Sequence, residues 1–132
     1  AYPPGSTFKP YMALAALESG KRTPKSAIHD PGYFEFGGRR FRDSKPGGNG
    51  YVDLYRSIVV SSDTFYYQLA NDMGIDAIAG FMGKFGFGAK SGIDLEGESI
   101  GVLPSQEWKR STQCPTTTGL SVLTDVAVPE ML

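Results

Sequence analysis

The segment from Ser6 to Ser19 constrains the fold more than any other part of this sequence. It is strongly apolar, follows a Pro-Pro-Gly turn and ends before Gly20. Its apolar residues are Phe8, Met12, Leu14, Ala15, Ala16 and Leu17. This pattern predicts a helix that ends at Gly20, since glycine commonly terminates helices. Because so apolar a helix has to be buried, other parts of the chain must pack on it.

A serine and a lysine lie three positions apart at the start of this predicted helix. Residues i and i+3 share a helix face, with Cβ atoms about 5–6 Å apart, so the amine of Lys9 can reach the hydroxyl of Ser6. A serine becomes a nucleophile when a base takes its proton, and a lysine relieved of its charge can be that base. The helix start also offers backbone amides to a developing oxyanion. The alternative is that Ser6 is an N-cap and Lys9 is solvated.

Three more polar residues, Ser61, Ser62 and Asp63, open another apolar stretch. We predict helices from Tyr51 to Val60, from Thr64 to Met73 and from Ile75 to Phe85, a loop at residues 86–103, and a short capped helix at residues 104–108. Alternating aromatic and charged residues around Gly37 and Gly38 predict a β-hairpin. The fold class is therefore α+β and mainly helical.

Composition excludes several classes of protein. The 132 residues are 40% hydrophobic and 20% charged, and the net charge is −1, which suits one small domain and does not suggest binding to nucleic acid. A single cysteine, Cys114, excludes an internal disulfide. No apolar run is long enough to span a membrane.

The order of short motifs is highly specific. It comprises Tyr2–Pro10, Asp30–Gly32, Arg42–Asp43, Ser61–Gln68, Asn71–Asp76, Met82–Gly88, Gly92–Leu95 and Leu103–Lys109. From Ala1 to about Arg110 the sequence resembles the penicillin-binding protein 2 family, the elongation-type class B peptidoglycan D,D-transpeptidases of Gram-negative bacteria. The resemblance implies that residues 1–110 are part of a transpeptidase domain of the penicillin-binding-protein and β-lactamase fold, without the central sheet strands.

The resemblance also implies serine acyl transfer without a cofactor. Ser6 would be the nucleophile and Lys9 its base, while Ser61 would relay a proton to or from the leaving amine. The backbone amide of Ser6 would be one oxyanion donor. Asp63 stands where many relatives have Asn; it could pair with Lys9, orient Ser61, or cap the helix at Thr64. The residues expected to bind substrate are Gly5, Ser62 and Thr64.

Some members of the family hold zinc near the active site through two Asp, a His and a Cys. Asp30 and Asp43 match the first two positions, but the other two carry Asn49 and Ser62, which are not usual zinc ligands. His29 is interpreted as an ordinary loop histidine. We therefore predict no metal site.

The expected partners follow from the family as well. They are peptidoglycan stem peptides, β-lactams and, through the full-length protein, the cell-elongation machinery. The location implied is the periplasmic side of the inner membrane, with the anchor outside this chain. The cluster Arg39, Arg40 and Arg42 could grip a glycan, but basic residues beside a hairpin favour a solvated face.

Two departures from the family limit what we expect of this chain alone. Residues 111–132 diverge, and we hypothesise a frameshifted or disordered tail. The third family motif, Lys-Thr-Gly or Lys-Ser-Gly on a strand, is missing, because Lys90-Ser91-Gly92 lies in a loop context. We therefore expect a marginally stable chain that is inactive alone. The alternatives are a β-lactamase or β-lactam sensor, or a non-enzymatic interaction fragment.

Overall fold

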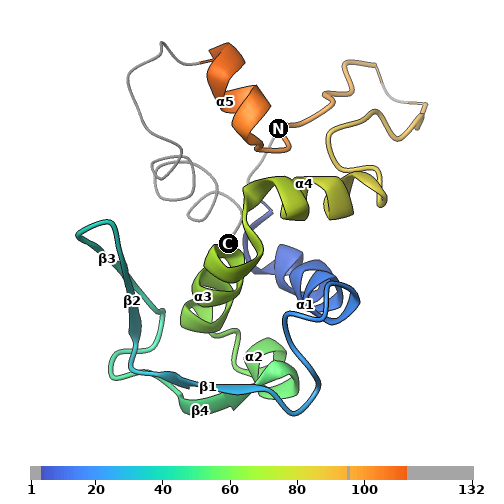
Figure 1. Ribbon diagram of the computed structural model, residues 1–132. Coiled ribbons are helices and arrows are strands. Elements are labelled where there is room, and N and C mark those ends of the chain that lie inside the picture. Colours follow the sequence, from blue (N-terminus) through green and yellow to red (C-terminus); the bar gives the residue numbers. More distant parts are fainter. Residues whose placement is uncertain (1–3, 95, 113–132) are drawn as a thin grey trace.

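The computed structural model describes residues 4–94 and 96–112 (Figure 1). Its elements, in chain order, are a 3-10 turn η1 (Gly5–Phe8), α1 (Lys9–Glu18), β1 (Ala27–Asp30), β2 (Tyr33–Phe36), β3 (Arg39–Arg42), β4 (Gly50–Asp53), α2 (Leu54–Val59), α3 (Asp63–Met73), α4 (Ile75–Gly83) and α5 (Gln106–Thr112). Among these described helices, none combines the length and the apolar character that crossing a membrane requires.

Helix α3 is the centre of the fold. It contacts α1 and α4 and also strands β1, β2 and β3, so that it joins the helical part to the strands (Figure 1). Its buried side chains include Phe65, Tyr66 and Leu69, none of which is exposed to solvent. Burying such large side chains is the main favourable term in packing these elements together.

Helix α1 is confirmed, but its start differs from the prediction. Residues Gly5–Phe8 form a 3-10 turn, and the α-helix proper begins at Lys9. One face is buried through Met12, Ala13, Ala15 and Ala16, whereas Leu14 and Leu17 are 46% and 40% exposed. The prediction of a buried helix is therefore right for one face. The other face carries the exposed Leu14 and Leu17 and is not covered by the described residues.

The hairpin predicted around Gly37 and Gly38 is confirmed as β2 paired antiparallel with β3. Phe34 lies opposite Phe41 in this ladder. Both rings pack against Tyr67 of α3, with ring centroids 6.4 and 5.7 Å away. These aromatic contacts fix the hairpin on the central helix.

The prediction of one helix from Tyr51 to Val60 is wrong in its first part. Gly50–Asp53 is strand β4, paired antiparallel with β1. The side chain of Asp53 then accepts a hydrogen bond from the backbone N–H of Arg56 at 2.7 Å and so caps α2. A cap at this position starts the helix and separates it from the strand. His29 lies on β1, not in a loop, with its ring edge-on to Tyr51.

The remaining predicted elements are confirmed with shifted ends. Helix α3 starts one residue earlier than predicted, at Asp63, α4 ends at Gly83, and α5 covers Gln106–Thr112. Residues 86–103 form neither helix nor strand where they are described. Of the predicted divergent segment 111–132, all but the end of α5 lies outside the described residues, including Cys114.

Two loops cross closely beside β1, and glycine makes the crossing possible. Gly48 has φ +75°, and a Cβ placed on it would lie 2.1 Å from the carbonyl oxygen of Asp30 and 2.3 Å from the backbone nitrogen of Gly32. Its neighbour Gly47 also has a positive φ, +82°, but a Cβ there would meet nothing within 4 Å. Both positions therefore require a positive φ, but only Gly48 also lacks the space for a Cβ atom.

We predict that Gly48→Ala is far more destabilising than Gly47→Ala. Both substitutions place alanine at positive φ, which costs about 1–2 kcal/mol. Only Gly48→Ala also forces the two backbones apart, which adds about 1–3 kcal/mol or more. Denaturant unfolding of both variants measures the difference. Equal losses of stability would contradict the close crossing.

Candidate active site

Four side chains from distant parts of the chain form a continuous hydrogen-bonded row. Ser61 Oγ donates to Ser6 Oγ at 3.1 Å. Lys9 Nζ donates to Ser61 Oγ at 2.9 Å and to Asp63 Oδ1 at 2.5 Å. Ser6 comes from η1, Lys9 begins α1, Ser61 precedes α3, and Asp63 is the first residue of α3. We call Ser6, Ser61, Lys9 and Asp63 the catalytic row.

The ammonium of Lys9 is buried and fully paired. Lys9 is 2% exposed, and its third hydrogen bond, at 2.7 Å, goes to the backbone carbonyl of Ser61. An ammonium has three donors, and all three are used. The ring of Tyr66 lies below it, 5.7 Å from Nζ to the ring centroid. Burial raises the pKa of Tyr66, and a hydrogen bond with Ser57 offsets part of this rise. The phenol therefore stays neutral beside the ammonium of Lys9.

The row places Ser61 between Lys9 and the predicted nucleophile. Among the described residues, no hydrogen bond joins Lys9 Nζ directly to Ser6 Oγ; the path runs through Ser61. A proton moving between Ser6 and Lys9 would therefore pass through the hydroxyl of Ser61. Catalytic hydrogen bonds often tighten only when substrate is bound, and the direct role of Lys9 as the base of Ser6 stays a prediction.

Ser61 has the only positive φ among the described non-glycine residues, +52°. A non-glycine residue in this region is strained and persists where the surroundings hold it. This backbone conformation lets both the carbonyl and the hydroxyl of Ser61 receive hydrogen bonds from Lys9. Strain at this position therefore accompanies the pairing of the buried ammonium.

Asp63 pairs with Lys9, which is one of the roles predicted for it. Its other oxygen, Oδ2, accepts the backbone N–H of Ser44 at 3.2 Å. The predicted alternative, that Asp63 caps α3, is wrong, because the cap is Ser62, whose side chain accepts the backbone N–H of Phe65. Ser44 was not predicted as part of the site, since a backbone donor from the loop after β3 leaves no signal in the sequence.

The other predicted site residues are placed as follows. Gly5 has φ +56° and begins the turn that carries Ser6, which is exposed. Neither helix start at Pro4 or Phe8 has a side-chain cap, so the N-cap alternative for Ser6 is wrong. Ser62 and Thr64 are buried, and neither side chain is open to a ligand. The side chains of Ser62 and Thr64 are therefore not accessible for the predicted contact with substrate.

A second polar cluster lies beside the row. It consists of Asp30, Asp43, Asn49 and Ser62, all buried. Asp30 Oδ2 accepts hydrogen bonds from Asn49 Nδ2 and Ser62 Oγ, both at 2.8 Å, and Oδ1 accepts the N–H of Gly32. Burial acts to raise the pKa of Asp30, but the hydrogen bonds from Asn49, Gly32 and Ser62 outweigh it, so that the pKa lies below its usual value. The cluster therefore keeps a buried carboxylate ionised.

The family resemblance implies a zinc site at these four positions in some members, and the residues present here do not fit that metal. Structural zinc sites use four ligands rich in thiolate and imidazole. Here Asn49 directs its amide nitrogen at Asp30, and Ser62 is a neutral hydroxyl that already donates to Asp30. No group of three or more His, Cys, Asp or Glu in the described part of the chain is arranged to hold a metal ion.

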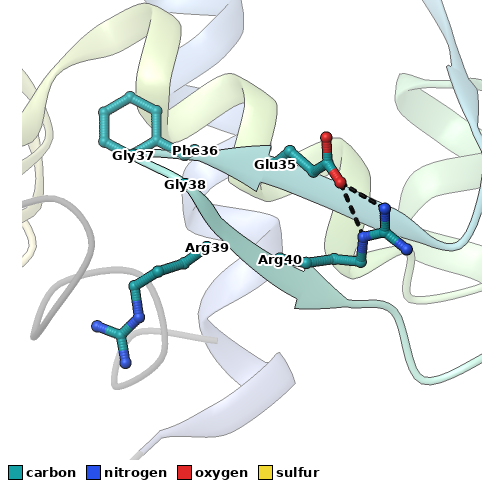
Figure 2. Close-up of a pocket in the computed structure, with 6 residues that line it drawn as sticks. All are labelled: Glu35, Phe36, Gly37, Gly38, Arg39 and Arg40. Atoms are coloured by element: carbon teal, nitrogen blue, oxygen red, sulfur yellow. Dashed lines mark hydrogen bonds and ion pairs between the residues drawn. The ribbon is translucent and has the colours of Figure 1, made fainter.

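The basic residues of the β2–β3 hairpin do not belong to the catalytic row or to the polar cluster. Arg40 pairs with Glu35 (Figure 2). It also lies over the ring of Tyr33, 4.2 Å from the guanidinium carbon to the ring centroid. An open pocket of about 260 Å³ is lined by residues 35–40 at the hairpin tip. None of the catalytic row lines it. Lys90-Ser91-Gly92 lies in no described strand, as predicted.

Comparisons with known proteins agree on one family. A family model described as the penicillin binding protein transpeptidase domain matches residues 1–127. Peptidoglycan D,D-transpeptidase MrdA of Escherichia coli (strain K12) is 48% identical over 111 residues, covering 83% of this chain and 18% of the relative. The chain thus spans less than a fifth of that curated relative.

Solved structures are similar too. Penicillin-binding protein 2 of Pseudomonas aeruginosa, in complex with WCK 5153, matches with a TM-score of 0.84 and 44% identity over 92% of this chain and 28% of that chain. Penicillin-binding protein 2 of Helicobacter pylori, in complex with MreC, matches with a TM-score of 0.80 and 34% identity over 92% of this chain and 23% of that chain.

The strain at Ser61 predicts a difference between two substitutions. Ser61→Ala and Ser61→Gly both remove the hydroxyl, but glycine adopts positive φ without the penalty. We expect Ser61→Gly to be more stable than Ser61→Ala by about 1 kcal/mol. Thermal unfolding of the two variants tests this order. The reverse order would show that the backbone of Ser61 is not strained.

Proposed function

The chain belongs to the penicillin binding protein transpeptidase domain family, and on this premise we propose that it carries the nucleophile and proton-relay part of a peptidoglycan D,D-transpeptidase. The observation that carries the proposal is the catalytic row, in which an exposed Ser6 is linked through Ser61 to the buried Lys9. The row brings together residues more than fifty positions apart. All four are the residues that the sequence predicts to be catalytic.

The proposed reaction is acyl transfer in two steps. Ser6 Oγ attacks the carbonyl of the penultimate D-alanine of a stem peptide, and the bond to the terminal D-alanine breaks. The proton of Ser6 leaves through the row, and the leaving amine receives a proton from it. An amine from a neighbouring stem peptide then takes the acyl group and restores Ser6. The backbone amide of Ser6, at the start of the helical segment, would stabilise the oxyanion.

Ser61 is suited to exchange protons in both directions. A hydroxyl donates one hydrogen bond and accepts up to two. In the structure, it accepts from Lys9 and donates to Ser6. This orientation suits delivery of a proton from the ammonium of Lys9 toward the leaving amine. The reverse transfer, from Ser6 toward Lys9, requires Lys9 to have first lost a proton.

Partners and location are proposed on the same premise. The substrates would be peptidoglycan stem peptides, and β-lactams would acylate Ser6 because they mimic the acyl donor. The solved relative in complex with MreC favours a partner within the cell-elongation machinery for the whole protein. The corresponding place of action is the periplasmic side of the inner membrane.

Although we expect no transpeptidation by the chain alone, we predict that its acylation step can still occur, so that a penicillin adds once to the purified chain and Ser6→Ala abolishes the adduct. No described strand carries Lys-Thr-Gly or Lys-Ser-Gly, the third family motif, so we expect slow labelling that needs a high penicillin concentration. Intact-mass spectrometry measures the adduct. Thr7→Val is the matched control, because it removes the neighbouring hydroxyl, which is bound to the carbonyl of Pro4, and leaves Ser6 in place. Labelling that survives Ser6→Ala would exclude Ser6 as the nucleophile.

We also predict that Ser61→Ala slows this labelling by about 100-fold, because it breaks the path between Ser6 and Lys9. The time course of the adduct mass measures the rate. Labelling at the wild-type rate would show that Ser61 does not relay the proton. The persistence of the adduct after excess penicillin is removed distinguishes a transpeptidase from a β-lactamase, which would release it.

A further inference from the structure

The polar cluster beside the catalytic row is connected to it at two points. Ser62 lies between Ser61 and Asp63 in the chain, and its hydroxyl donates to Asp30 at 2.8 Å. Asp43 precedes Ser44, whose backbone N–H donates to Asp63. These contacts connect Asp30 and Asp43 to the residues on either side of Ser62.

The hydrogen bonds of the cluster use up the oxygens of Asp30 and Asp43. Asp30 receives three donors, from Gly32, Asn49 and Ser62. Asp43 Oδ2 receives the N–H of Thr64 at 3.0 Å, and Oδ1 receives the N–H of Lys45 at 3.1 Å. Buried carboxylates are stable only when they are hydrogen-bonded or paired. Here the donors are backbone amides, the hydroxyls of Ser62 and Ser44, and the side-chain amide of Asn49.

The cluster also holds the strained turn. Ser61 keeps a positive φ, and Ser62 follows it with its backbone N–H bound to the carbonyl of Ser57 at 3.0 Å. The Ser62 hydroxyl caps α3 and at the same time donates to Asp30. Strained residues persist when the surrounding contacts over-determine them. Among the described residues, the side chain of Asn49 donates to Asp30 and makes no hydrogen bond with the turn itself. Asn49 is therefore linked to the turn only through Asp30 and Ser62.

We propose that this hydrogen-bonded cluster takes the place of a metal centre in this chain, and that Asn49 and Asp30 are positioning residues that act through Ser62 on Ser61 and Lys9. The proposal rests on the proposed function for its catalytic meaning. Its structural part does not depend on the proposed reaction. Asn49 fixes the position of the Asp30 carboxylate, and Asp30 fixes the position of the Ser62 side chain. Ser62 in turn fixes the backbone turn at Ser61, which pairs with the ammonium of Lys9.

The first test measures the environment of the Lys9 ammonium in the catalytic row and does not depend on any reaction. Because the Lys9 ammonium is buried and donates all three protons, we expect a slowly exchanging signal in a proton–nitrogen NMR spectrum. Asn49→Ala should shift or broaden this signal, although Asn49 is not a hydrogen-bond partner of Lys9. Ser62→Ala, which removes the other side-chain donor to Asp30 Oδ2, is the second variant and should do the same.

The matched control is Asp53→Ala. It removes the N-cap of α2, just as Ser62→Ala removes that of α3, so the two substitutions have a similar direct cost in stability. Asp53→Ala should leave the Lys9 signal in place. An unchanged signal in Asn49→Ala, or an equal change in Asp53→Ala, would overturn the positioning role.

The second test uses penicillin labelling of the same variants. We expect Asn49→Ala to lower the first-order acylation rate about 10-fold or more while the half-saturating penicillin concentration stays the same, because small displacements of a reacting group reduce the rate strongly. Asp53→Ala should label at the wild-type rate. If only the half-saturating concentration changes, positioning is excluded. If wild type is not labelled at all, the proposed function fails while the NMR test still decides on the cluster.

The third test concerns the metal. We expect the purified chain to carry far less than one equivalent of zinc by elemental analysis, and its unfolding temperature to be unchanged by a chelator or by added zinc. Retention of one equivalent of zinc after dialysis, or a drop in unfolding temperature with the chelator, would overturn the view that hydrogen bonds replace a metal here.

Discussion

The pairing of the buried Lys9 ammonium is the interaction on which the rest of the site depends. A charged side chain that is 2% exposed is costly unless it is fully hydrogen-bonded, and all of its partners, Ser61 and Asp63, lie more than fifty residues away. The start of α1 and the start of α3 therefore have to meet. Their meeting also brings Ser61 against Ser6. One electrostatic requirement thus assembles a nucleophile and a proton path.

The same pairing accompanies the backbone strain at Ser61, whose φ is the one positive value among the described non-glycine residues. Lys9 Nζ donates hydrogen bonds to both the carbonyl and the hydroxyl of Ser61, the residue that has the positive φ. Such strain costs about 1–3 kcal/mol and needs support from the surroundings. The support comes from the next residue, since Ser62 is fixed at its backbone by Ser57 and at its side chain by Asp30.

The sequence was sufficient where local signals were strong. The hairpin followed from its Gly-Gly turn and α3 from its apolar pattern, whereas the pairing of Asp63 with Lys9 was one of three roles that the sequence left open. Pairing between β1 and β4 was missed because nothing local links two short strands separated by a hairpin and a loop. For the same reason residues 51–53 were assigned to a helix, although Asp53 is its cap. The capping role of Ser62 was missed because the neighbouring Asp63 is an equally good cap by residue type.

In the described part of the chain, the hydrogen bonds that the two carboxylates of the cluster accept come from neutral donors. Asp30 and Asp43 lie at the N-terminal end of α3, where the N–H of Thr64 is bound by Asp43 and that of Phe65 by Ser62. Unpaired amides and the helix dipole favour negative charge at such an end. A metal would bring two positive charges to the same place. Asn49 and Ser62 instead supply directed neutral donors, which compensate less charge than a cation but fix the angle of each contact. The turn at Ser61, Ser62 and Asp63 can then be held by hydrogen-bond geometry alone.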